Sequence, residues 1–167
     1  MAGFAIFVFL LMIFSILILL LSVKVVPQGM EYTVERFGKY TVTLGSGLNI
    51  IVPFVDRIGQ KLNMKEQLIN VPSQEVISKD NAKLAIEAVI FFQVTDAAKA
   101  AYEVENLNNA VLNFMKINLH TVVGTISMDQ LQHSYGEINA RLLDDVREAT
   151  EAWGIEVIRI SYTKSEI

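Results

Sequence analysis

The chain of 167 residues has no cysteine, and it has only two histidines and three prolines. Without cysteine it cannot form disulfide frameworks, zinc–thiolate sites, iron–sulfur clusters or a cysteine nucleophile. His120 and His133 are too far apart in the sequence to form a helical metal pair. We therefore expect neither a metal ion nor a cofactor.

Charged side chains are missing from the first 23 residues, and Lys24 is the first of 14 basic and 18 acidic residues. Between Lys24 and Lys65 six basic residues stand against three acidic ones. The ratio is four to seven from Glu66 to Met128 and four to eight from Asp129 onward. A basic part beside the apolar end fits a body that stands on anionic lipid. The net charge of −4, without a basic stripe, argues against nucleic-acid binding.

A long apolar run occupies the N-terminal end. The 20 residues Phe4–Val23 contain no charge, and only Ser15 and Ser22 are polar. As a helix that rises about 1.5 Å per residue, this run spans about 30 Å, the thickness of the hydrocarbon core of one bilayer. We predict a transmembrane anchor over residues 1–23. The predicted span includes Phe4, Phe7, Leu11, Phe14, Leu17, Leu20 and Val23.

Two other membrane arrangements compete with a straight anchor. A cleaved secretory signal requires basic residues before the run, a shorter run and small residues at a cleavage site, and these features are missing. A re-entrant hairpin is disfavoured because the first proline, Pro27, lies beyond the run. Lys24, Arg36 and Lys39 follow the span and no basic residue precedes it, which predicts a single-pass protein with a cytoplasmic body.

Residues 24–72 are expected to form a membrane-proximal, β-rich lobe. Strand-like runs at Met30–Arg36, Tyr40–Leu44 and Leu48–Val52 are separated by turn residues. The nearly apolar segment Leu48–Val55 has two interpretations, a strand buried on both faces or a segment that dips into the lipid interface. The residues that we expect at the membrane surface are Lys24, Arg36, Lys39, Ile51 and Phe54.

Residues 73–167 are expected to form a second lobe of mixed structure. Gln74–Ser78 and Ala82–Val94 predict a hairpin around a Lys79-Asp80-Asn81 turn, and the apolar side chains of Val89 and Phe91 predict that helices cover its second face.

Two longer helices and a closing strand should follow the hairpin. A short helix is expected from the Asp96 cap to Tyr102, and a longer one over Asn106–Val123. A Ser134 capping box starts another helix that reaches Trp153, and a strand over Ile155–Tyr162 completes an α+β fold. The expected apolar stripes are Leu107, Val111, Phe114 and Ile117 on the first long helix, and Ile138, Leu142, Val146, Ala149 and Trp153 on the second.

Short motifs that suggest catalysis have structural explanations. Gly45-Ser46-Gly47 lacks the further glycine of a dinucleotide site and is typical of a turn. Ser161–Lys164 matches S-x-x-K without the motifs that accompany it in penicillin-binding proteins. We therefore expect no enzymatic activity and no catalytic residues.

Several motifs together resemble one known family. They are Val26–Gly29, Thr33–Tyr40, Val52–Ile58, Ser73–Asn81, Gln93–Asp96, Ala101–Val104, Ile138–Leu142 and Trp153–Ile155. With an N-terminal span before them, they closely resemble the SPFH (stomatin, prohibitin, flotillin) or band 7 family, and most closely its bacterial stomatin-like (paraslipin) branch.

The resemblance implies a non-enzymatic scaffold of the bacterial inner membrane. Such a protein would self-associate, organise membrane microdomains and regulate neighbouring membrane proteins, including proteases of protein quality control. Membrane lipid, further copies of the chain and an NfeD-type membrane protein are the implied partners. A regulatory partner that binds one membrane protease or channel as a single copy is the alternative.

Three departures from the family pattern bear on assembly. Leu119-His120 and His133–Gly136 replace segments that usually contain an arginine, with His120 and Tyr135 at the altered positions. The long coiled-coil helix that usually follows is missing after Ile167. These departures predict weaker closed cages than the resemblance implies.

Overall fold

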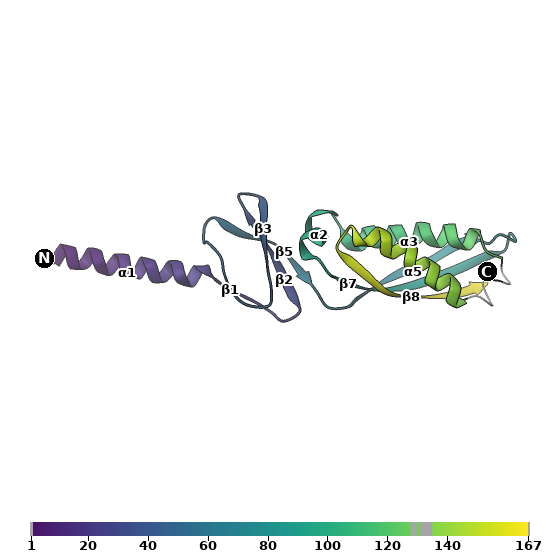
Figure 1. Ribbon diagram of the computed structural model, residues 1–167, viewed down its shortest axis with the longest axis horizontal. Coiled ribbons are helices and arrows are strands. Elements are labelled where there is room, and N and C mark those ends of the chain that lie inside the picture. The colour runs from purple at the N-terminus through teal and green to yellow at the C-terminus, as the bar shows by residue number, and fades with distance from the viewer. Residues whose placement is uncertain (1, 128–129, 131–134, 167) are drawn as a thin grey trace. The chain divides into compact units, whose positions relative to one another are not determined.

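A computed structural model describes residues 2–127, 130 and 135–166 (Figure 1). The chain divides into two compact units, Met1–Asn63 (unit 1) and Met64–Ile167 (unit 2). The boundary was expected after Pro72 but lies after Asn63. The strand that contains Pro72 belongs to the sheet of unit 2. An apolar helix, a β-rich region, further helices and a closing strand confirm the predicted α+β class.

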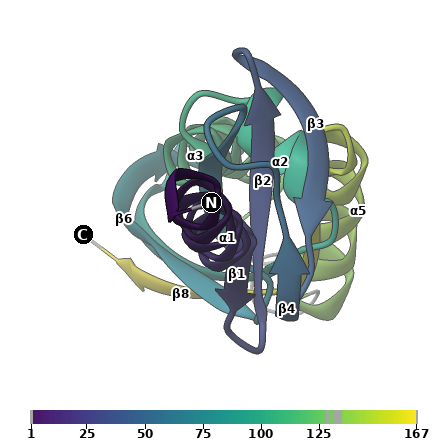
Figure 2. The same cartoon turned by 90° about the vertical axis from the view of Figure 1, so that its left-hand side faces the viewer.

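Unit 1 contains one helix and two small antiparallel sheets. Its elements are α1 (Ala2–Ser22), β1 (Val23–Val26), β2 (Met30–Arg36), β3 (Lys39–Leu44), β4 (Gly47–Ile50) and β5 (Asp56–Asn63). Strands β1 and β4 pair with each other, and the second sheet has the order β3-β2-β5. Figure 2 shows β2 and β3 as neighbouring strands.

A compact apolar core joins the strands of unit 1. It consists of Val26, Val34, Leu44 and Ile51. Beside Val34 the fully buried Thr33 hydroxyl accepts a hydrogen bond of 2.9 Å from the Gln60 amide, where the register between β2 and β5 shifts. This bond satisfies a polar group that the bulge buries.

Unit 2 is built on a three-stranded antiparallel sheet of order β6-β7-β8, with strands β6 (Gln67–Ile77), β7 (Lys83–Val94) and β8 (Ile155–Glu166). The predicted hairpin is confirmed, although its first strand starts earlier, at Gln67. Pro72 lies in an edge strand, between Val71 and Gln74, where the register shifts. At such a bulge proline can be accommodated although it has no amide hydrogen to donate.

The helices of unit 2 are α2 (Ala97–Tyr102), α3 (Leu107–Gly124) and α5 (Tyr135–Glu151). Asp96 and Asn106 cap α2 and α3 as predicted, because their side chains accept hydrogen bonds of 3.0 Å from the Lys99 and Asn109 amides. The predicted Ser134 cap lies outside the described residues, and α5 ends before Trp153.

The helices cover one face of the sheet. Helix α3 packs on β6 and α5 packs on β8 (Figure 1), and the side chains of β7 alternate between buried and accessible. The buried set is Leu84, Ile86, Ala88, Ile90, Phe92 and Val94. The prediction that helices also cover Val89 and Phe91 is wrong, because these side chains are only half-buried on the opposite face. Arg159 shields Phe91 instead, with its guanidinium 4.3 Å from the ring centre.

The buried row on α3 differs from the predicted stripe. Val111, Met115 and Leu119 are buried at intervals of four residues, whereas Ile117 is 65% exposed. Residues four apart lie on one side of a helix, and on α3 this side packs on β6 of the sheet. Ile117 does not belong to this row. On α5 the predicted Leu142 and Val146 are buried.

Candidate membrane-facing site

Helix α1 supplies the apolar part of the site. Gly3–Ser22 is long and apolar enough to cross a membrane, and in the described residues it is the one helix with these properties. Its predicted spanning residues Phe4, Phe7, Leu11, Phe14, Leu17 and Leu20 are exposed. Val23 was expected to end the span, but it opens β1 and pairs with Ile50. The helix therefore ends one residue earlier, at the start of a strand.

An apolar ribbon continues directly from this helix. Val23 lies opposite Ile50 and Val25 lies opposite Leu48, so the four side chains, which we call the apolar ribbon, share one face of β1 and β4. All four are exposed. The Ile51 amide donates a hydrogen bond of 2.9 Å to the carbonyl oxygen of Ser22, the last residue of α1. The ribbon is thus tied to the end of the apolar helix.

The structure corrects the first interpretation of Leu48–Val55. A strand buried on both faces is excluded because Leu48, Ile50 and Phe54 are exposed. Ile51, which was expected at the membrane surface, is 7% exposed and belongs to the core of unit 1. Ile50 is the last residue of β4 and points outward, and the alternation continues one residue beyond the strand, so Ile51 points inward. Contact of the exposed residues with lipid stays a prediction.

Phe54 lies at the tip of a tight loop between β4 and β5. The Asp56 amide donates to the Val52 carbonyl oxygen at 2.9 Å, and the Val52 amide donates to Asp56 Oδ2 at 2.8 Å. The loop holds Phe54 in the left-handed region, with φ of 70°, and leaves it 87% exposed. This conformation costs a residue with a Cβ about 1–2 kcal/mol.

Phe37, in the turn between β2 and β3, resembles Phe54 in its positive φ and its exposure. Phe37 and Gly38 form the two-residue loop between the paired residues Arg36 and Lys39, with φ of 54° and 80°. Such loops favour asparagine, aspartate or glycine because both φ angles are positive. Phe37 is nevertheless present and 88% exposed. Phe37 lies between two predicted strand-like runs and was expected only as a turn residue, although a phenylalanine before glycine in such a turn is itself an unusual signal.

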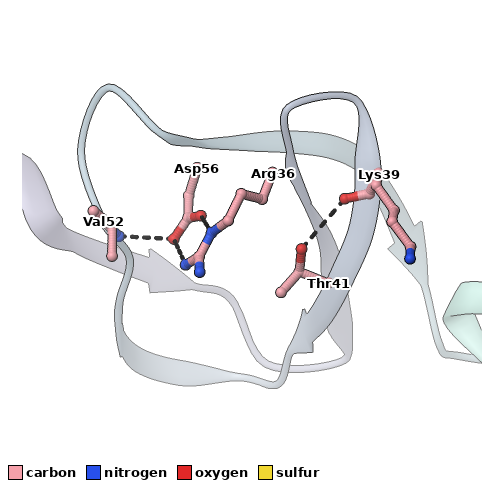
Figure 3. A network of polar contacts seen from close by, with 5 residues as sticks. All are labelled: Arg36, Lys39, Thr41, Val52 and Asp56. Atoms are coloured by element: carbon pink, nitrogen blue, oxygen red, sulfur yellow. Dashed lines mark hydrogen bonds and ion pairs between the residues drawn. The ribbon is translucent and has the colours of Figure 1, made fainter.

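An ion pair links the two loops (Figure 3). Arg36 Nε lies 2.8 Å from Asp56 Oδ1, and Arg36 Nη2 lies 3.2 Å from Asp56 Oδ2. The Asp56 side chain is 6% exposed and that of Arg36 is 44% exposed. The hydrogen bonds from Arg36 and from the Val52 amide lower the pKa of Asp56, and those to Asp56 raise the pKa of Arg36. Arg36 was expected at the headgroups, but its guanidinium is bonded to the Asp56 carboxylate, which also closes the Phe54 loop.

A cleft of about 500 Å³ lies beside this ion pair. Its lining residues are Glu35, Phe37, Gly38, Phe54, Val55, Asp56 and Arg57. The sheet thus brings together two phenylalanines that stand 17 positions apart in the sequence. Of the remaining predicted basic residues, Lys39 is exposed and Lys24 is half-buried opposite Asn49.

Comparison with known protein families matches residues 24–166 to the SPFH domain / Band 7 family. The chain belongs to the SPFH/band 7 family. The match begins at Lys24 in β1, just after α1 ends, and it includes both the cleft and all three strands of the unit 2 sheet. The resemblance stated from the sequence motifs is thereby confirmed at the level of the family.

Similar SPFH proteins occur in distant organisms. The chain is 38% identical to an uncharacterized protein of Methanothermobacter thermautotrophicus over 87% of its own length and 45% of the relative's. An uncharacterized protein of Mycobacterium tuberculosis is 36% identical, over 93% of this chain and 41% of the relative. Mitochondrial stomatin-like protein 2 of Rattus norvegicus is 34% identical, over 80% of this chain and 38% of the relative. The chain spans less than half the length of these three relatives.

Of the two positions at which the resemblance implied an arginine, His120 is exposed on α3. Tyr135 begins α5, and its side chain lies outside the described part.

Replacing Asp56 by asparagine should loosen the Phe54 loop of the SPFH domain. The folded-state pKa of Asp56 is below its ordinary value of 3.8, so its stabilising effect is present above that value and lost as the pH falls through the folded-state pKa. We expect Asp56→Asn to speed hydrogen exchange at the Val52 amide at neutral pH and to remove this part of the acid dependence of stability. Exchange mass spectrometry measures the first effect and pH-dependent thermal unfolding the second.

Asp145→Asn is the matched control, because Asp145 is exposed on α5 in the other unit. Unchanged exchange at Val52 in Asp56→Asn would show that the ion pair does not hold the loop.

Proposed function

We propose that the chain is a non-enzymatic, membrane-anchored SPFH scaffold that self-associates and organises membrane lipid or neighbouring membrane proteins. The observation that carries this proposal is the direct continuation of the apolar helix α1 into the apolar ribbon, tied by the bond between Ser22 and Ile51. A span followed by an outward-facing apolar ribbon suits a body that rests on the bilayer. Membership of a generally non-enzymatic family supports the absence of catalysis.

Membrane contact would then have two parts. Helix α1 crosses the hydrocarbon core, and the apolar ribbon lies at the interface, where removing apolar surface from water yields about 25 cal/mol per Å². Lys24 and the exposed Lys39 would lie near anionic headgroups on the cytoplasmic side. The bacterial inner membrane is the proposed location.

Self-association would follow from local concentration. Copies that are confined to one membrane meet at a high effective concentration, so contacts that are weak in solution become sufficient for assembly. An assembly of this kind could gather lipid, an NfeD-type membrane protein or a membrane protease around it.

Crosslinking of the full chain in native membranes tests the scaffold. We expect a ladder of homo-oligomers at native expression level, and discrete assemblies above monomer mass after extraction in native nanodiscs. A tenfold dilution of the protein with added lipid serves as the control, since contacts driven by local concentration should decrease. A purely monomeric population would contradict the scaffold, and a fixed 1:1 complex with a protease or channel would favour the single-copy regulator.

A further inference from the structure

We propose that the outer strands of both three-stranded sheets are built to prevent strand pairing between copies of this chain, so that copies in one membrane meet through side chains. The inference rests on the proposed self-association and states which contacts that association excludes. The edge of a sheet presents unpaired amide and carbonyl groups to any other strand. Copies that are anchored in one membrane bring identical edges together at high effective concentration, so open edges would pair with one another.

The outer strand of each ladder has one residue more than the central strand beside it. The sheets have the orders β3-β2-β5 and β6-β7-β8, and each of their four ladders contains one register shift. In the ladders that the structure describes, the additional residue is always on the outer strand and never on β2 or β7. Such a bulge bends its strand, so the outer edge does not offer a straight row of groups to another strand. The bulged positions are Thr41 on β3, Gly59-Gln60 on β5, Pro72-Ser73 on β6 and Ile158 on β8.

Side chains of α5 bond to the backbone on both sides of the β8 bulge. Arg147 Nε donates a hydrogen bond of 2.9 Å to the Val157 carbonyl oxygen. Asn139 Nδ2 donates one of 2.8 Å to the Ile160 carbonyl oxygen. These two carbonyl groups flank the bulge at Ile158. A strand from a second copy would have to displace bonds to a helix of the same chain before it could pair at this point.

The bulge of β6 is closed by its own neighbour. Gln74 Nε2 donates hydrogen bonds of 2.9 and 3.0 Å to the carbonyl oxygens of Pro72 and Ser73. Pro72 has no amide hydrogen. The middle of β6 therefore offers one donor fewer and two carbonyl groups that are already bonded, which makes it a poor template for a second strand.

The strands of unit 1 have related features. The Thr41 hydroxyl donates a hydrogen bond of 3.3 Å to the Lys39 carbonyl oxygen at the β3 bulge (Figure 3), and the Gln60 amide in the β5 bulge donates to Thr33 Oγ1. Strands β1 and β4 pair without a register shift, but each has only four residues. Very short strands are another means of protecting an edge.

The burial pattern of β8 shows how its edge can be opened. Val157 and Ile160 are buried, and the two residues between them, Ile158 and Arg159, are exposed. Without Ile158, buried and exposed positions alternate regularly, so the core residues keep their face of the sheet. The opened variant lacks Ile158 and carries Arg147→Met, which removes one bond to the edge and keeps an unbranched side chain.

Hydrogen exchange in nanodiscs tests the proposal. The wild-type chain and the opened variant would be placed in discs that hold either one chain or several, and mass spectrometry would follow the amides of the outer strands. We expect the wild-type amides to exchange at the same rate in both kinds of disc. In the opened variant, β8 amides should exchange about tenfold more slowly, or slower still, when several chains share a disc. Ile158→Ala keeps the extra residue and is the control that should behave like the wild type.

Trp153 fluorescence reports whether the opened variant folds. If it does not fold, deletion of Ser73 with Pro72→Thr opens β6 instead and should slow exchange there. Slower exchange of any outer strand when wild-type chains share a disc would overturn the proposal, as would folded opened variants whose exchange is independent of the number of chains. A wild-type chain that stays monomeric in crowded discs would contradict the proposed self-association alone, because the opened variants still test the edges.

Discussion

Two arginines in the middle of α1 should release the chain from the bilayer. In the variant Leu11→Arg/Phe14→Arg, each guanidinium replaces an exposed apolar side chain that has no protein surface around it to compensate a charge. An arginine at the centre of a span costs about 2.5–3.5 kcal/mol on insertion scales, so two cost about 5 kcal/mol or more. We expect the wild-type chain to resist carbonate extraction from membranes and the variant to appear in the extracted fraction.

The control for this experiment is Leu11→Met/Phe14→Leu, which retains an apolar span and should stay in the membrane. Vesicle flotation of the extracted variant then measures how far the apolar ribbon binds lipid without the anchor. A double-arginine variant that still resists carbonate would show that α1 is not the anchor.

Adding a single methyl group at Gly154 should strongly destabilise unit 2. Gly154 is buried with φ of 69°, and a Cβ built there would lie 2.6 Å from the Asp96 carbonyl oxygen and 2.7 Å from Lys99 Cβ. The Gly154 carbonyl oxygen also accepts hydrogen bonds of 2.9 and 3.0 Å from the Thr95 and Asp96 amides. The backbones of Gly154 and Asp96 therefore cannot move apart without loss of these hydrogen bonds. We expect Gly154→Ala to lower the free energy of unfolding by about 3 kcal/mol or more.

Trp153 offers a direct measurement of this effect. It is the only tryptophan of the chain and its ring packs edge-on against Phe114, with centroids 6.0 Å apart, so its fluorescence follows the unfolding of unit 2. The midpoint should fall by about 10 °C or more. Gly136→Ala is the matched control, because a Cβ at Gly136 meets open space on α5 and should leave stability unchanged or raise it by up to about 1 kcal/mol. Equal midpoints in the two variants would contradict the steric argument.

Local signals in the sequence were sufficient to predict those elements whose formation depends only on residues that are neighbours in the chain. The uncharged run of α1 and the caps at Asp96 and Asn106 are visible without a partner strand or helix. The alternation along β7 also identified its buried face correctly. Hydrophobic periodicity, capping and positive φ are properties of a few consecutive residues, so the sequence alone is enough to recognise them.

The candidate site itself depended on tertiary structure. Strand β5 was not predicted because Asp56–Asn63 is mostly polar and forms only through pairing with β2. That pairing brings Asp56 to Arg36 and thereby sets Phe54 beside Phe37, and it decides that Ile51 is buried while Ile50 is exposed.

By itself, the sequence determined the apolar helix, the α+β order of elements and the family, because each is encoded in local composition and motif. Only the tertiary structure decided the aromatic cleft and the inward turn of Ile51. The physical reason is that register and burial arise from contacts between residues distant in the chain, which no local pattern contains.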